Sequence, residues 1–354
     1  FKLKENMKFD AVVGNPPYNG TNGQQIYTDF YLTSRIIGDV VSLIFPIGWQ
    51  EPKNANNLSK LNSKEIKEDC QIVQIDNRQN CFPKILGAEW TNIILWKRGF
   101  NNQLVGKQRI LTNGKNPSIV KLITKKSQIP KPVEIKKLVD IVTKHKEFKP
   151  LQEITSARKP YGFSTDFLKD PSKYGLPDTI FDEQKNKNDI KLYSKEGIIK
   201  YLPSNYPFPK NKDDTAFDKY KVFVPYAWGN WSEKNGLGGA FSDIIIAGPR
   251  EVVTEYAQES GKFNDFETAR NHAKYLMTQF CRACLYFNKH SQHSTTAWGA
   301  VPQQCFTESW WNLSISEINE ELLKKYAIPN YIKEFIQANF QVKDESNILN
   351  FDGI

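Results

Sequence analysis

The sequence predicts an α/β fold in the first third of the chain and an irregular α+β domain in the remainder. Within residues 9–96, short apolar runs alternate with segments of helical periodicity, a pattern typical of α/β sheets. From Pro150 onward, proline, glycine and aromatic residues become frequent, which favours short strands and long loops. No apolar run approaches ~18 residues, so the sequence predicts no membrane span.

The first part is expected to contain strands and helices in alternation. The apolar run at Phe9–Gly14 predicts a buried strand, and the helical spacing of apolar residues in Gln24–Gly38 predicts a helix. This alternation favours a parallel or mostly parallel sheet. The other expected elements are a strand at Val40–Phe45 that ends at Pro46, a polar helix at Leu58–Asp69, and strands at Ile72–Ile75 and Thr91–Trp96.

Charge divides the chain into three predicted segments, residues 1–108, 109–149 and 150–354. The net charge is +9, and residues 109–149 alone carry 11 basic and 3 acidic side chains. Such a cluster is typical of a phosphate-binding surface, and a solvated linker helix has the same composition. Within this basic connector, one apolar stripe predicts a helix: Ile135, Leu138, Val139 and Val142.

Three helices are expected in the last segment. They fall near Phe266–Phe287, Ile315–Tyr326 and residues 331–340. The second begins with Ser314 three residues before Glu317, the spacing of a capping box.

The tetrapeptide Asn15-Pro16-Pro17-Tyr18 follows the first predicted strand directly. Open α/β sheets bind ligands at the carboxyl ends of their strands. An Asn amide oxygen and a rigid proline carbonyl form a pair of acceptors that match the two N–H bonds of an exocyclic amine. Acceptors held in this way would localise the nitrogen lone pair and increase its nucleophilicity, which is catalysis by positioning and preorganised dipoles.

These residues carry a resemblance to a known family. Asn15-Pro16-Pro17-Tyr18 after an apolar strand resembles the catalytic motif of amino-methyltransferases that use S-adenosylmethionine. The stretches VVSLIFPIGWQ and IVQIDNRQNCFPKILGAEWTNIILWKR are similar to later motifs of N6-adenine DNA methyltransferases. The second half resembles the recognition domains of type II restriction–modification methylases at KPYGFSTDF, TEYAQESGKFNDFETARNHAKYLMTQF, HSTTAWGAVPQQCF and ISEINEELLKKYAI.

The resemblance implies a fold and a chemistry. The fold would be the carboxyl half of a Rossmann-like methyltransferase sheet, residues 1–108, followed by a target-recognition domain, residues 150–354. Asn15 and the Pro16 carbonyl would hold the amine of a flipped adenine in duplex DNA, with Pro17 completing the loop. Tyr18 and Phe82 would stack on the base. Methyl transfer from S-adenosylmethionine would be direct and in line, and Lys125, Lys126, Lys136 and Lys137 of the basic connector would contact the DNA backbone.

The sequence departs from the family at its beginning. The family has a γ-like order of motifs, in which a Gly-rich cofactor loop and an acidic residue lie upstream of the catalytic motif. Of the cofactor contacts, only Asn15 has a counterpart in this sequence, and Gly236–Gly239 lacks the strand–turn–helix setting of a substitute. We therefore expect a separate amino-terminal part, in the same native chain or another, and no methyl transfer by this segment alone. An associated nuclease domain upstream is compatible with the sequence.

Three other functions share parts of this pattern. Methyltransferases acting on a protein glutamine also use this tetrapeptide, and they would not need the large aromatic-rich second domain. Cytosine N4 methyltransferases more often carry Ser in place of Asn. A DNA-binding specificity fragment without activity of its own is the non-enzymatic alternative.

The five cysteines form no framework typical of secreted proteins, which favours a reducing, cytoplasmic environment. Cys281 and Cys284 lie near His290 and His293, but their spacing within an apolar run marks one buried helix face. The gap to the histidines is short for a zinc finger. The sequence therefore predicts no bound metal.

Overall fold

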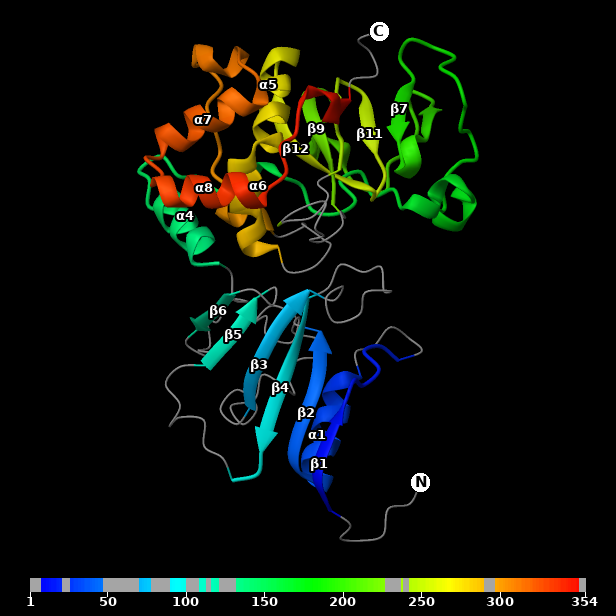
Figure 1. Cartoon of the computed structure of the whole chain (residues 1–354). Helices are drawn as coiled ribbons and strands as arrows, with labels where there is room; N and C mark the ends of the chain where they lie inside the picture. The colour runs from blue at the N-terminus through cyan, green and yellow to red at the C-terminus, as the bar shows by residue number, and fades with distance from the viewer. Residues whose placement is uncertain are drawn as a thin grey trace. The chain divides into compact units, whose positions relative to one another are not determined.

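The computed structural model describes residues 8–20, 26–46, 70–77, 90–99, 108–112, 116–120, 132–226, 237, 242–289 and 297–349. The chain divides into two compact units, residues 1–132 and 133–354, which are described separately (Figure 1). Within the described residues, no helix is both long and apolar enough to cross a membrane.

The first unit contains a four-stranded sheet with one covering helix. In chain order its elements are β1 (Phe9–Gly14), α1 (Tyr27–Ile37), β2 (Gly38–Pro46), β3 (Cys70–Asn77) and β4 (Trp90–Lys97). The strand order is β1-β2-β4-β3. The expected helix and the four expected strands are confirmed, while the predicted helix at residues 58–69 lies outside the described residues.

The prediction of a mostly parallel sheet is wrong. β1 and β2 are parallel, but β4 lies between β2 and β3 and is antiparallel to both. Antiparallel neighbours need no helical crossover, so strands in such a sheet do not have to alternate with helices. The sheet is therefore mixed. The sequence does not reveal this, because apolar runs of similar length form both parallel and antiparallel strands.

The basic connector expected at residues 109–149 falls on both sides of the division between the units. Its first part overlaps a hairpin of β5 (Gln108–Thr112) and β6 (Asn116–Val120) in the first unit. Its helix, α4 (Val133–Thr143), belongs to the second unit. The predicted apolar stripe of α4 is confirmed, because all four of its residues are buried.

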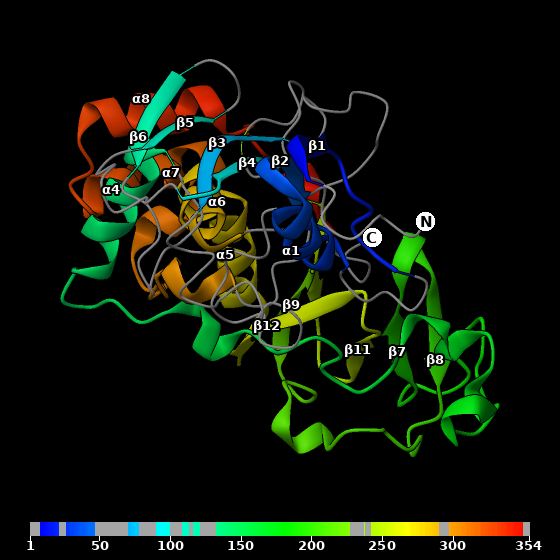
Figure 2. The ribbon, with the colours of Figure 1, turned by 90° about the horizontal axis from the view of Figure 1, so that it is seen from below.

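The second unit combines two small sheets with a group of helices. One sheet has the order β12-β9-β10-β13 and the other β11-β7-β8. The strands of the second sheet are labelled together in Figure 2. Helix α5 packs against β9, β10 and β12, and α4 packs against α6 and α8. The strands are β7 (Ile190–Tyr193), β8 (Ile199–Leu202), β9 (Tyr220–Pro225), β10 (Ile244–Ala247), β11 (Glu251–Val253), β12 (Ala257–Phe263) and β13 (Ile348–Leu349); the helices are α5 (Phe266–Met277), α6 (Gln279–Asn288), α7 (Ile315–Lys325) and α8 (Asn330–Asn339).

Aromatic side chains fill the core between these sheets. Phe163 packs on Phe167 with ring centroids 4.8 Å apart, and Phe208 meets Phe217 edge to face at 5.5 Å. Aromatic pairs in such geometries add to the gain from apolar burial. Many of the aromatic residues of the second half therefore form its hydrophobic core.

One expected helix is two helices. The sequence predicts a single helix at Phe266–Phe287, but α5 ends and α6 begins at Thr278, whose ψ is 149°. The Thr278 side chain accepts a hydrogen bond from the Cys281 backbone N–H at 3.2 Å and so caps α6. Helical periodicity continues through the break, which is why the pattern alone did not reveal it.

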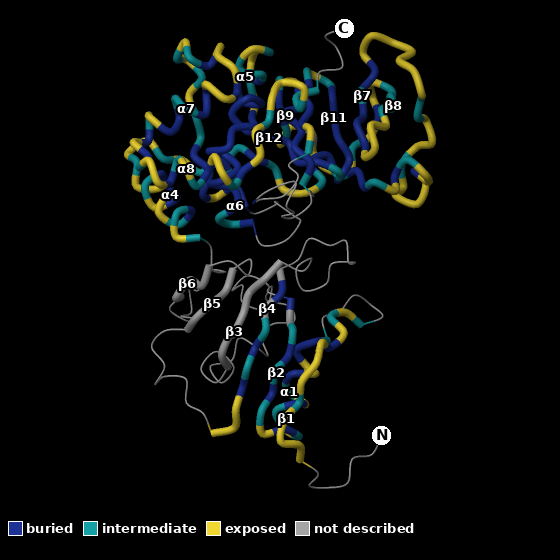
Figure 3. Tube along the Cα trace, viewed as in Figure 1, coloured by how far each residue is buried: buried dark blue, intermediate teal, exposed yellow. Residues whose placement is uncertain are grey.

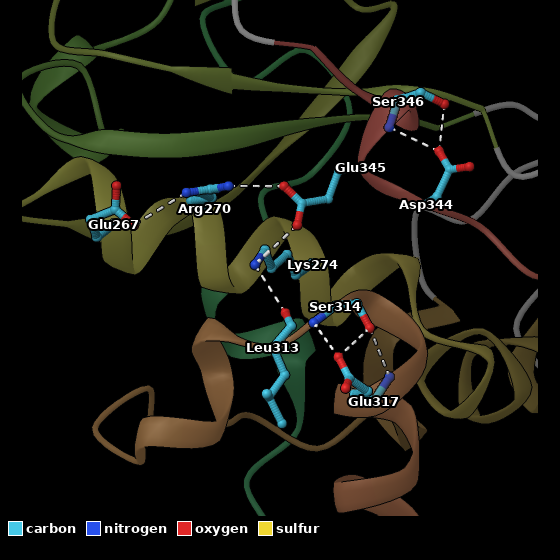
Figure 4. A network of polar contacts seen from close by, with 9 residues as sticks. All are labelled: Glu267, Arg270, Lys274, Leu313, Ser314, Glu317, Asp344, Glu345 and Ser346. Carbon is cyan, nitrogen blue, oxygen red and sulfur yellow. Dashed lines mark hydrogen bonds and ion pairs between the residues drawn. The ribbon is translucent and has the colours of Figure 1, made fainter.

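The carboxyl-terminal segment is fixed to α5 by an ion-pair network (Figure 4). Glu345 accepts from Arg270 at 2.9 Å and pairs with Lys274 at 3.2 Å. The nearly buried Lys274 also donates to the Leu313 carbonyl, just before α7. The predicted capping box of Ser314 and Glu317 is confirmed.

Candidate functional site

The tetrapeptide Asn15–Tyr18 lies at the carboxyl end of β1. Gly14, the last residue of β1, pairs with Leu43 of the parallel strand β2. The carboxyl ends of both strands therefore face the same edge of the sheet. This is the edge at which open α/β sheets bind ligands.

The side chains of the turn differ in exposure. Asn15 and Pro17 are exposed, Pro16 is buried, and Tyr18 is half-buried. Burial of Pro16 fixes the turn, and the exposed amide of Asn15 is accessible to a ligand. The Tyr18 carbonyl accepts a hydrogen bond from the Ile26 backbone N–H at 3.1 Å, which ties the turn to the start of α1.

Helix α1 orients Tyr18. The Tyr18 ring meets Tyr27 edge to face, with centroids 6.2 Å apart and planes at 75°. Tyr27 is buried, as is Tyr31 one turn later, so both anchor α1 to the sheet. The position of the Tyr18 ring is therefore set by core packing.

The opposite end of α1 is also held. Arg98, which follows β4, donates to the Gly38 carbonyl at 2.8 Å and pairs with Asp39 at 2.7 Å. Arg35 stacks over the Trp96 ring at 4.9 Å. These contacts fix the end of α1 and the start of β2, on the side away from the turn. The turn is therefore attached to elements that are themselves held in place.

The sequence predicts that β1 is buried, and this prediction is wrong. Five of its six residues are exposed, Val13 by 73% and Phe9 by 42% (Figure 3). β1 is an edge strand of the described sheet and pairs only with β2 there. An apolar run is equally consistent with a strand covered by its own chain and one that another segment covers, which explains the error.

The remaining predicted site residues are placed as follows. Phe82, Lys125 and Lys126 lie outside the described residues. Lys136 and Lys137 lie on α4, where Lys136 is half-buried and Lys137 is exposed. The Lys137 ammonium lies 5.2 Å from the Tyr331 ring centre, so part of its charge interacts with this aromatic face.

Cys281 and Cys284 are fully buried on α6, as expected, but α6 is buried on every side over residues 279–286, so their spacing does not mark one buried face. Burial raises the pKa of both thiols, which disfavours the thiolate that binds metals. His290 and His293 lie outside the described residues. Among the side chains that the structure describes, no three His, Cys, Asp or Glu residues are grouped as metal ligands would be.

His272 gives the second unit a specific acid sensitivity. The imidazole is fully buried, its Nε2 lies 2.9 Å from the Ser260 hydroxyl, and burial lowers its pKa from 6.5 to about 3. Below pH 6.5 the unfolded chain therefore binds a proton that the folded chain does not, and stability falls as the pH decreases toward 3. We expect wild type to lose about 2 kcal/mol more than His272→Gln between pH 7 and pH 5 in urea unfolding. Parallel pH profiles would contradict this.

Comparisons with known proteins bear on the first unit. Residues 1–82 match the Eco57I restriction-modification methylase family. The matched segment contains Asn15–Tyr18 and ends at Phe82, so both parts of the predicted base-binding site fall within it. No curated protein matches the chain.

Three solved structures resemble the chain at low identity. The type IIL restriction-modification enzyme MmeI, solved in complex with DNA, has a TM-score of 0.42 and 12% identity. The match covers 90% of this chain and 50% of the MmeI chain. The type IIG restriction endonuclease BpuSI has a TM-score of 0.31 and 11% identity, covering 88% and 45%. The ATP-dependent type ISP enzyme LlaBIII, bound to DNA, has a TM-score of 0.31 and 12% identity, covering 89% and 30%. The chain thus spans half or less of the length of these proteins.

One charged cluster was not identified from the sequence. Arg158, Lys159 and Lys210 meet in the second unit, although Lys210 lies 51 positions after Lys159 in the chain. The stretch KPYGFSTDF indicates a recognition domain by its resemblance, but its charge alone does not indicate a cluster. The available signal was the run Arg158-Lys159 before a Pro-Tyr-Gly turn.

Proposed function

We propose that this chain is the catalytic and target-recognition part of an N6-adenine DNA methyltransferase in a restriction–modification system. The observation that carries the proposal is the methylase family match at residues 1–82, which includes an exposed Asn15 at the carboxyl end of a strand. Residues 150–354 would recognise the target sequence, and residues 109–149 would connect the two functions.

The chemistry follows from the acceptors of the turn. The Asn15 side-chain oxygen and the Pro16 carbonyl would accept hydrogen bonds from the two N–H groups of the adenine amine and direct its lone pair away from the ring. Pro17 would keep the loop rigid. S-adenosylmethionine, when bound, supplies an electrophilic methyl group for direct transfer to this nitrogen. The exposed Asn15 amide fits a role at the junction of base and cofactor.

Base stacking would complete the site. An adenine must leave the duplex to reach such a turn, and aromatic faces compensate for its lost stacking. Tyr18 is held by Tyr27 in a fixed orientation, which suits a preformed wall. Phe82 would form the other wall, and Lys125, Lys126, Lys136 and Lys137 would contact phosphates.

The exposed edge of β1 would accept the cofactor-binding part of the enzyme. An edge strand offers unpaired backbone groups, and exposed apolar edges are normally covered. Val13 and Phe9 supply the apolar area that such a partner would bury. This pairing would place a cofactor loop at the same sheet edge as Asn15.

The proposal is tested by sequencing DNA from cells with and without the complete gene, using a method that detects methylated bases. We expect N6-methyladenine at every copy of one short sequence in cells that carry the gene. Methylation confined to cytosine, or no methylated base in the DNA, would contradict the proposal.

A further inference from the structure

Residues 156–163 run along the edge of β12 in the second unit and are fixed at both ends; we call them the basic arc. At one end, the Ser156 backbone N–H donates to the Glu259 carbonyl at 2.7 Å. At the other, the Glu255 backbone N–H donates to the Phe163 carbonyl at 2.8 Å. The arc is thus held at one end by Glu259 of β12 and at the other by Glu255, two residues before that strand begins.

The turn inside the arc is conformationally constrained. Lys159 has a φ of +59°, a conformation that costs a non-glycine residue about 1–2 kcal/mol. Its carbonyl accepts from the Gly162 N–H at 3.1 Å. Gly162 has a φ of +89°, and a Cβ there would lie 2.6 Å from the Pro209 Cβ. The arc and the loop at residues 209–210 therefore pack backbone against backbone.

This packing brings three cations together. The Lys210 ammonium donates to the Lys159 carbonyl at 2.6 Å, and the Arg158 guanidinium lies over the Tyr226 ring at 5.0 Å. The side chains of Arg158 and Lys159 remain 50% and 39% exposed. Lys210 is exposed as well.

A single carboxylate, Glu255, pairs with two of these cations. One oxygen of Glu255 pairs with Arg158 at 2.9 Å and Lys159 at 3.2 Å. The other accepts from the backbone N–H and hydroxyl of Thr165. Burial opposes ionisation of Glu255, but the Thr165 N–H and the two cations outweigh it and lower its pKa.

The cluster keeps a net positive charge. Arg158 and Lys159 share one carboxylate, Glu255, whose side chain is only 11% exposed, and Lys210 adds a third positive charge at the Lys159 carbonyl. Asp213 and Asp214 follow Lys210 along the chain and are exposed, but no ion pair joins them to the three cations within the described residues. The positive charge is therefore directed to solvent.

We propose that the basic arc and Lys210 bind the phosphate backbone of duplex DNA, and that Glu255 is a positioning residue for Arg158 and Lys159. The proposal rests on the proposed DNA methyltransferase function and assigns it a contact surface in the second unit. Charge-assisted bonds to phosphate are stronger than neutral ones. Cations that are held in place before binding lose less conformational entropy when they form such bonds. Glu255, Tyr226 and the strained turn provide that order, and such strained residues occur often at ligand clamps.

The first test measures the salt dependence of duplex binding by fluorescence anisotropy. Each neutralised phosphate contributes about 0.9 to the slope of log affinity against log salt, so Arg158→Gln, Lys159→Gln and Lys210→Gln together should reduce the slope by about 2 to 3. Specific and unrelated duplexes should weaken alike, because phosphate contacts carry no sequence information. The matched control replaces the exposed Lys187, Lys195 and Lys324 with Gln and should leave the slope unchanged.

The second test separates positioning from neutralisation. If Glu255 only offsets charge, Glu255→Gln adds one positive charge and tightens binding. If it positions the cations, Glu255→Gln weakens binding by about 3- to 10-fold despite the added charge. Glu183→Gln, at an exposed site, makes the same change in net charge without touching the arc. If Glu255→Gln does not fold, the triple variant of the first test still shows whether the arc binds DNA, because its three substitutions lie on exposed side chains.

Failure of this inference differs from failure of the proposed function. An unchanged salt slope in the triple variant, or no duplex binding by the wild-type chain, overturns the inference. Methyl transfer is measured independently of either result. A reduced slope, together with no adenine methylation in cells that carry the complete gene, supports the arc as a DNA contact and contradicts the proposed enzyme.

Discussion

Asn15→Ala is expected to reduce methyl transfer at least about 10²-fold in the enzyme that this chain forms with its cofactor-binding part. The amide oxygen of Asn15 is the proposed acceptor that activates the adenine nitrogen, and alanine offers no acceptor. The residue is exposed, so the substitution removes chemistry and leaves packing intact. Transfer of a labelled methyl group to duplex DNA gives the measurement.

The matched control for this prediction is Asn19→Ala. Asn19 is exposed in the same segment and directly follows Tyr18. It should retain activity, and both variants should bind duplex DNA with near wild-type affinity because that affinity comes mainly from phosphate contacts. Near-normal turnover in Asn15→Ala would refute the proposed mechanism.

Glu259→Ala is expected to cost the second unit about 3–5 kcal/mol of unfolding free energy, the range for breaking a buried charge network. Glu259 is buried, and its side chain accepts from the Tyr161 hydroxyl and from the Ala216 backbone N–H at 2.8 Å. It also faces Lys221, which is fully buried. Burial lowers the pKa of Lys221 to about 8, with Glu259 and Glu251 acting in the opposite direction. Removing Glu259 leaves that ammonium with less compensation.

Urea unfolding of the full chain measures this cost, and Glu183→Ala, at an exposed site, is the control with no expected change. The double variant Glu259→Ala with Lys221→Met should recover part of the loss, because the uncompensated charge is then removed. A loss below about 1 kcal/mol in Glu259→Ala would show that the pair contributes little, as exposed ion pairs do.

Local signals in the sequence predicted individual elements well. The capping box at Ser314 and the apolar stripe of α4 specified their helices, because capping and helical periodicity act within a few residues. The turn at Asn15–Tyr18 was predicted to follow a strand, and it does. The same local signals continued through Thr278, so the break between α5 and α6 was missed.

The sequence by itself determined that a rigid, acceptor-rich turn follows an apolar strand, and that basic residues are concentrated in one segment. Only the tertiary structure decided that β4 is inserted antiparallel, that β1 is exposed, and that Arg158 and Lys159 meet Lys210. Strand order, burial and charge clusters depend on contacts between residues far apart in the chain. Propensity and periodicity are properties of neighbours, so they carry no information about which distant segments will pair.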